Sequence, residues 1–144
     1  MSQADVRNRP GYQVKRAQQA LHQACERQLR PLGISMSKYA VLLALADEPG
    51  ISSAALARRC FVTRQSLQDV LGGLRSAGLV AVAEQAGTGR ARPVTLTDEG
   101  ARLLREADRA IVEVENRMLA GIDRADRRRL VELLTTCAEN LNED

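Results

Sequence analysis

The sequence predicts a mainly α-helical fold with a small β-hairpin wing, arranged as a winged helix-turn-helix with further helices at both ends. Between residues 51 and 100, two short helical segments flank a tight turn, and a strand, a Gly- and Arg-rich turn, a return strand and a capped helix follow. Aromatic residues make up only 2% of the chain, so a core of leucine, valine and alanine favours helices. Apolar stripes at helical spacing lie on both sides of this segment.

The N-terminal part is expected to hold two helices. Residues 1–10 are polar and are predicted to be irregular, whereas apolar residues from Tyr12 to Leu29 recur at helical spacing. Pro31 ends this first helix. Ser37 is the expected cap of the second, whose apolar face is predicted to include Ala40, Val41, Leu42, Leu43 and Leu45.

The central segment contains the two helices of the helix-turn-helix. Ser52 or Ser53 can cap the first of them, and residues 60–62 form the turn. Thr63 is a suitable cap for the second, because its hydroxyl can accept from the exposed amides two or three residues further on. Gly78 ends this helix in a left-handed conformation. Its predicted buried stripe is Leu67, Val70, Leu71 and Leu74.

The wing is predicted from two short strands. Leu79–Ala83 forms the first, a turn follows at residues 87–89, and the second runs from Arg92 to Leu96. Since Pro93 has no amide proton to donate, that side of the return strand is expected to be an edge.

The C-terminal part is predicted to form two amphipathic helices. Thr97 or Asp98 caps the first, whose apolar stripe continues to Ile122, further than one small winged lobe can cover. Asp123 or Asp126 begins the second. We therefore expect a second copy of the chain to cover the terminal apolar faces. The stripe of the last helix is Leu130, Leu134, Cys137 and Leu141.

The net charge changes along the chain at the boundaries of the predicted segments. The whole chain carries +3, but residues 51–97 carry +4 and residues 98–144 carry −4. A basic central segment suits a polyanionic partner, although a solvated basic face has the same composition. The expected division is an N-terminal arm and first dimerisation helix (1–34), a DNA-binding lobe (35–97) and C-terminal dimerisation helices (98–144).

Several classes of protein are disfavoured. The N-terminus lacks the apolar core of a signal peptide, and no charge-free apolar run is long enough for a membrane span, so a cytoplasmic protein is expected. Three widely spaced cysteines without a CxxC pattern disfavour a disulfide scaffold or a zinc site, and no cofactor is predicted. One histidine, no phosphate-binding glycine loop and no nucleophile beside a base disfavour an enzyme.

Four motifs stand in a specific order and spacing: Ser35-Met36-Ser37-Lys38-Tyr39 before an apolar helix, Leu56-Ala57-Arg58-Arg59, Gly78-Leu79-Val80, and Leu96-Thr97-Asp98-Glu99-Gly100. Through them the chain resembles the MarR (multiple antibiotic resistance regulator) family of bacterial transcription regulators, from about Tyr12 to Leu141. The resemblance implies an obligate homodimer, with the first, fifth and sixth helices in the interface and two winged lobes astride a pseudo-palindromic operator. It also implies repression, and release from DNA by a small aromatic effector or by thiol oxidation.

Three features depart from the family pattern. Thr88 stands where the wing usually has an aspartate. Phe61 occupies a turn position that is usually glycine, and a positive φ is uncommon for a bulky residue. Gly72 and Gly73 lie inside the predicted recognition helix, where each glycine destabilises the helix by roughly 1 kcal/mol relative to alanine. This pair indicates either a softer helix or close packing against it.

The predicted DNA contacts come from the recognition helix and the wing. Arginine suits guanine and glutamine suits adenine in the major groove, whereas wing arginines suit a narrow minor groove. Asp69 lies among them and would repel phosphates unless it accepts from cytosine or braces an arginine. The alternatives are an ordinary solvated helix face and a charged edge strand. The predicted contacts are Ser37, Lys38, Ser53, Thr63, Arg64, Gln65, Ser66, Gln68, Arg75, Arg90 and Arg92.

A few side chains could bind an effector or sense oxidation. Tyr12, His22, Met36 and Tyr39 could contact an aromatic effector between the dimer interface and the DNA lobe, or could pack in the core. His22 and Cys25 are one turn apart, but two ligands are too few for a metal. In the peroxide-sensing branch of the family the reactive cysteine lies nearer the start of the first helix, so buried, inert thiols are expected here.

The leading hypothesis is a homodimeric, sequence-specific DNA-binding transcriptional regulator, a repressor released by a small-molecule effector. The alternative is a winged-helix interaction module that has lost specific DNA binding. Thr88 and the glycine pair fit the alternative, whereas Arg64 and Arg90 favour a DNA reader.

Overall fold

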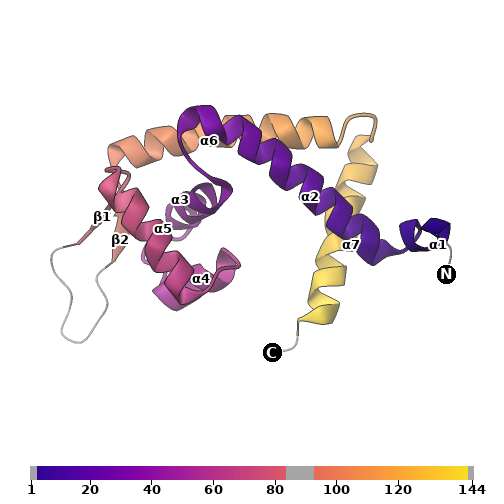
Figure 1. Ribbon diagram of the computed structural model, residues 1–144, viewed down its shortest axis with the longest axis horizontal. Helices are drawn as coiled ribbons and strands as arrows, with labels where there is room; N and C mark the ends of the chain where they lie inside the picture. The colour runs from indigo at the N-terminus through magenta and orange to yellow at the C-terminus, as the bar shows by residue number, and fades with distance from the viewer. Residues whose placement is uncertain (1–2, 84–92, 143–144) are drawn as a thin grey trace.

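The fold is mainly helical with one two-stranded antiparallel hairpin, as the sequence predicts (Figure 1). It is seen in a computed structural model that describes residues 3–83 and 93–142. The elements, in chain order, are α1 (Gln3–Arg7), α2 (Pro10–Leu29), the 3-10 turn η1 (Arg30–Leu32), α3 (Met36–Asp47), α4 (Ser53–Arg59), α5 (Arg64–Ser76), β1 (Val80–Val82), β2 (Val94–Leu96), α6 (Asp98–Met118) and α7 (Arg124–Leu141).

The N-terminal prediction needs two corrections. A five-residue helix, α1, occupies part of the stretch that was expected to be irregular, and the Gln13 side chain donates to the Arg7 carbonyl at 2.7 Å. Helix α2 begins at Pro10 rather than at Tyr12. Amides in the first turn have no partner within the helix, so the missing amide proton of proline costs nothing there, and its φ already suits a helix.

Helix α3 is capped by Ser35, not by Ser37. Ser35 has an extended backbone and its hydroxyl accepts from the Lys38 amide at 3.2 Å, whereas Ser37 already lies inside the first helical turn. The predicted apolar face is also partly wrong, because Leu43 is exposed. The side chains of α3 that are buried are Tyr39, Val41, Leu42, Ala44 and Leu45.

The helix-turn-helix has the expected caps. The Ser52 hydroxyl accepts from the Ala55 amide at 3.1 Å to begin α4, and the Thr63 hydroxyl accepts from the Ser66 amide at 3.0 Å to begin α5. Gly78 follows α5 with a φ of 75°. The inner face of α5 buries Leu67, Leu71 and Leu74, with Val70 half-buried.

The wing base is locked to the start of α6 by Thr97. In the short hairpin, Val80 pairs with Leu96. The Thr97 hydroxyl donates to the Gly78 carbonyl at 2.6 Å and accepts from the Gly100 amide at 3.0 Å. A Cβ on Gly100 would overlap the carbonyl oxygen of Leu79. These contacts use a hydroxyl at position 97 and leave no room for a Cβ at position 100.

Helix α6 joins the two ends of the molecule. Its start lies above the lobe formed by α3, α4, α5 and the hairpin, and α7 descends from its far end (Figure 1). It ends at Met118, so Ile122 lies beyond it rather than on its stripe. Arg127 donates to the carbonyl groups of Leu119 and Ile122, which fixes the corner into α7.

The core lies where α2, α3 and α6 meet and continues into the lobe. Leu29, Leu42, Leu67 and Leu74 are fully buried. Helix α7, by contrast, has no buried residue in the single chain, and Asp123 is its cap. The chain alone therefore leaves the apolar face of α7 uncovered.

In the described parts of the chain, no single helix has the length and apolar composition to cross a membrane. The pair Pro10–Leu32 and Met36–Asp47, bent by 82°, meets that criterion by length and composition only.

Candidate nucleic-acid interface

A shallow groove of about 530 Å³ runs along the outer face of α5. Burial of Leu67 and Leu71 on the inner face turns the polar residues of the first turns outward. The structure thus brings together four of the predicted DNA contacts and adds one carboxylate. The groove is lined by Ser53, Arg64, Gln65, Gln68 and Asp69.

The Thr63 cap fixes the Ser66 side chain at the start of α5. Besides accepting from the Ser66 amide, the Thr63 hydroxyl donates to the Ser66 hydroxyl at 3.0 Å. Both residues are exposed. The first turn is therefore ordered before any ligand arrives, and its free amides and positive helix end face solvent.

Lys38 lies over one of the two glycines inside α5. A Cβ built on Gly73 would lie 3.5 Å from Lys38 Cε and 3.7 Å from Lys38 Nζ, whereas one on Gly72 would meet nothing within 4 Å. These are ordinary van der Waals distances to a flexible side chain, so alanine would fit at either position and packing does not require either glycine. Sequence reasoning had placed Lys38 at the interface without this partner.

The other predicted DNA contacts are more dispersed. Ser37 is exposed on the first turn of α3, and Arg75 is exposed on the last turn of α5. Arg90 and Arg92, like Thr88, lie outside the described residues.

The turn between α4 and α5 has the left-handed backbone that suits the glycine usual at this position, although phenylalanine occupies it. Phe61 has a φ of 57°, and among the described residues it is the only non-glycine with a positive φ. The Phe61 amide donates to the Arg58 carbonyl at 3.2 Å and the Val62 amide to the Ala57 carbonyl at 3.0 Å. This pair of bonds closes α4 in a Schellman motif with phenylalanine at the left-handed position.

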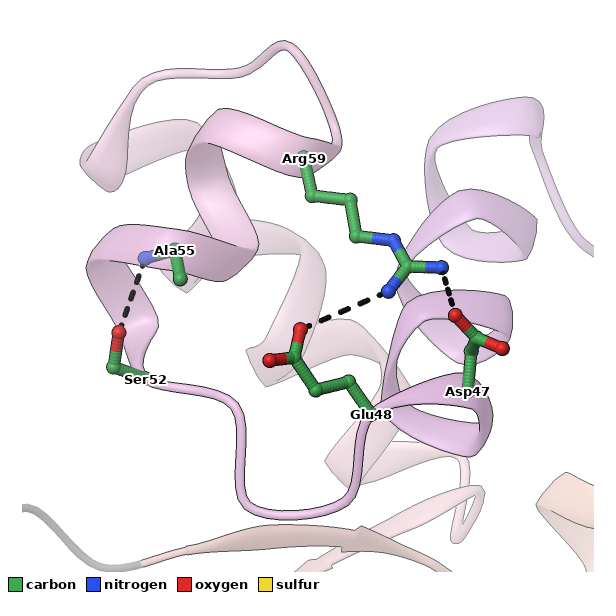
Figure 2. A network of polar contacts seen from close by, with 5 residues as sticks. All are labelled: Asp47, Glu48, Ser52, Ala55 and Arg59. Atoms are coloured by element: carbon green, nitrogen blue, oxygen red, sulfur yellow. Dashed lines mark hydrogen bonds and ion pairs between the residues drawn. The ribbon is translucent and has the colours of Figure 1, made fainter.

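Sequence reasoning missed an ion-pair network behind the turn. Figure 2 shows Arg59 of α4 between two carboxylates at the end of α3. Its Nη2 lies 2.5 Å from Asp47 Oδ2 and its Nη1 lies 3.8 Å from Glu48 Oε2. These groups are 12 and 11 residues apart, beyond the reach of helical periodicity. The network ties α4 to α3 and neutralises Arg59.

Three of the four effector candidates lie where α2, α3 and α6 meet. His22 Nε2 lies 3.9 Å from Glu26 Oε1, and that oxygen accepts from the Met36 amide at 2.8 Å. Tyr39 is buried and its hydroxyl donates to Asp108 of α6. Tyr12 is 41% exposed and lies almost three turns before His22 on the same helix. The structure therefore does not group Tyr12 with the other three.

The Tyr39 hydroxyl is held in its neutral form. Burial and the hydrogen bond to Asp108 raise the pKa of Tyr39 above its usual range. Burial, together with Glu115 and Glu26, raises the pKa of the Cys25 thiol. Burial also raises the pKa of Cys60, against a weaker opposing effect of Arg59.

Within the ranges 3–83 and 93–142, no three histidine, cysteine or acidic side chains are grouped so that they could hold a metal ion.

The comparisons with known proteins agree with this architecture. The MarR family model matches residues 32–91. The HTH-type transcriptional repressor Rv2887 of Mycobacterium tuberculosis is 34% identical over 124 residues, which cover 86% of this chain and 89% of the relative.

Solved structures also match this chain over most of its length. Rv2887 in complex with salicylic acid has a TM-score of 0.74 at 32% identity, over 90% of this chain and 96% of that one. Rv2887 in complex with DNA has a TM-score of 0.74 at 31% identity, over 90% and 97%. The fold alone is shared with the repressor CouR bound to a 23-mer DNA duplex, at a TM-score of 0.86 and 24% identity over 96% and 98%. The chain belongs to the MarR family of transcriptional regulators.

Proposed function

We propose that this protein is a homodimeric, sequence-specific DNA-binding regulator that represses transcription and releases DNA when a small effector binds. The observation that carries the proposal is the groove on α5, where Arg64, Gln65 and Gln68 are exposed on a helix whose opposite face buries Leu67, Leu71 and Leu74. Arginine and glutamine pair bidentately with guanine and adenine edges, and the major groove admits one helix.

The remaining predicted contacts would orient the protein on the duplex. Ser53, Thr63 and Ser66 lie near the start of α5, whereas Ser37 and Lys38 lie on the first turn of α3 and Arg75 lies on the last turn of α5. Hydroxyl, ammonium and guanidinium groups contact phosphates without reading sequence. Arg90 and Arg92 keep their assignment to the minor groove on sequence grounds alone.

A second copy of the chain would cover the apolar side chains that one copy leaves in water. On α2 and α6, Tyr12, Val14 and Val112 are exposed, and α7 buries none of its residues. Exposed apolar side chains on the three longest helices favour a two-fold interface. This arrangement would place two recognition helices on one face of the duplex.

An aromatic effector is supported by the relative crystallised with salicylic acid. In this chain, Tyr39 and Asp108 join α3 of the lobe to α6, and His22 and Met36 lie close to Glu26 beside this junction. A ligand bound here would act on the joint between the DNA lobe and the dimer helices.

The test is binding of purified protein to fluorescent duplexes from its own upstream region, at low and physiological salt, with a scrambled competitor. We expect binding that resists the competitor and weakens as salt rises, because neutralised phosphates release counterions. Arg64→Ala should weaken specific binding by roughly 1–3 kcal/mol and relax the sequence preference at one position.

The control is Arg124→Ala, at the start of α7 and away from the α5 groove, which should leave binding unchanged. Equal binding of all sequences, abolished by salt, would contradict the proposal and favour an interaction module. Unchanged sequence preference in Arg64→Ala would contradict the assignment of α5 to the major groove.

A further inference from the structure

Phe61 is the most exposed large apolar side chain in the described part of the molecule. It is 95% exposed and is the single phenylalanine of the chain. A phenylalanine in this position contributes nothing to the core and leaves almost its whole ring in water. Packing in the core therefore does not account for a phenylalanine at this position.

The backbone makes the choice of residue more unusual. The Schellman bonds to Arg58 and Ala57 require a left-handed conformation at position 61, which the φ of 57° shows. Glycine adopts this conformation freely, whereas a side chain with a Cβ is strained in it. Gly33, Gly50, Gly78 and Gly121 occupy the other positive-φ positions among the described residues. Strain of this kind persists at functional sites, where the side chain itself is needed.

The position of Phe61 in the lobe indicates which partner would cover the ring. Phe61 lies two residues before the Thr63 cap, so its Cα is within about 8 Å of the start of α5. Arg58 and Arg64 are exposed on either side of it in the sequence. Phe61 thus lies between two exposed arginines in the sequence, close to the start of the helix whose groove Arg64 and Gln65 line.

We propose that Phe61 is a specificity-determining residue that contacts the C5-methyl group of a thymine in the operator. This inference rests on the proposed function, because α5 must enter the major groove to bring the turn close to the bases. The neighbouring arginines suit the phosphates that flank the major groove. The C5-methyl of thymine is the apolar group that this groove displays. Phe61 adds an apolar contact to the polar readout by Arg64 and the glutamines.

The experiment uses the full-length protein and a duplex selected from a random pool by the wild type. Phe61→Gly removes the ring and relieves the backbone, so its melting temperature should equal or exceed that of the wild type. Its dissociation constant for the selected duplex should rise at least about fivefold, the lower end of the effect of one wrong base pair. Phe61→Leu keeps an apolar side chain and should stay within about twofold of the wild type.

The second arm of the experiment replaces the thymines of the duplex by deoxyuridine, one position at a time, which removes only the methyl group. In the wild type, one position in each half-site should weaken binding, and the same replacement should have no effect on Phe61→Gly. Arg64→Ala, although weaker overall, should keep the deoxyuridine effect.

Unchanged affinity of Phe61→Gly, or an equal deoxyuridine effect in both proteins, would overturn the contact and leave the proposed function standing. A loss of affinity that no thymine accounts for would also overturn the assignment to a methyl group. If the wild type selects no sequence at all, the proposed function fails and this contact fails with it.

Discussion

At Tyr39, one hydroxyl joins helix α3 of the winged lobe to helix α6. Its hydrogen bond to Asp108 links α3 to α6 across 69 residues of sequence. The sequence predicts Tyr39 as either a core or an effector residue, and the structure shows the ring buried in the core. The partner could not be predicted, because nothing local relates residues that distant.

Replacing Tyr39 by phenylalanine should lower the free energy of unfolding by about 1 kcal/mol at neutral pH, the usual contribution of one hydrogen bond. Urea denaturation of the two proteins measures the difference.

The same difference should depend on pH in a defined direction. Since the pKa of Tyr39 is raised in the folded state, the unfolded chain loses this proton first, from about pH 10. The stabilisation is complete below that pH and is lost as pH rises further. The wild type should therefore approach Tyr39→Phe in stability above pH 10, and a constant difference from pH 9 to 11 would contradict this account.

The cysteines should differ in reactivity. Cys25 is 1% exposed and Cys60 is partly buried, and burial raises the pKa of both thiols, which lowers their thiolate fraction. Iodoacetamide at pH 7.5 should modify Cys60 before Cys25, as peptide mass analysis would show. Labelling of native Cys25 as fast as in urea would contradict burial and revive a redox-sensing role for this residue.

At the scale of the elements, caps and turns were more predictable than burial. Thr63 and Gly78 act as the sequence predicts, because side-chain caps and left-handed glycines are local features. Leu43 was assigned to the wrong face, because an unbroken apolar run gives no phase to a helix. The predicted cap of α3, Ser37, was wrong, because Ser35 two residues earlier can cap equally well and is the one that does so.

Gly100 and Gly72 are matched tests of the packing between elements. Gly100→Ala should lower the free energy of unfolding by about 3 kcal/mol, the upper end of overpacking effects, because its Cβ would meet the Leu79 carbonyl. Gly72→Ala meets nothing within 4 Å and should raise stability by about 0.5–1 kcal/mol through helix propensity. Thermal or urea unfolding distinguishes them, and a tolerated Gly100→Ala would show that the wing base is not fixed as described.

At the scale of the whole molecule, the sequence anticipates both the winged lobe and the uncovered terminal helices. A stripe such as Leu130, Leu134 and Cys137 predicts an apolar face without showing what covers it. The structure adds that α7 lies away from the lobe, held at its start by Arg127 (Figure 1). The exposed residues of α5 that line the groove, Asp69 among them, were identified from the sequence, but the groove itself was not.

The dimer can be tested on α7. Leu134→Glu places a charge on the apolar face and should shift the mass at micromolar concentration from dimer to monomer in light scattering. Glu139→Lys also changes charge, but it lies about 140° around the helix from Leu134 and should leave the dimer intact. A wild-type monomer, or equal dissociation of both variants, would contradict the proposed interface.

Two copies of the α5 groove should contact one operator together. Sequencing the duplexes that the wild type selects from a random pool decides this. We expect a two-fold symmetric site whose half-sites lie about 10 bp apart, centre to centre, with a preference that Arg64→Ala relaxes within each half. A selected pool without a shared sequence, or with a single asymmetric site, would contradict it.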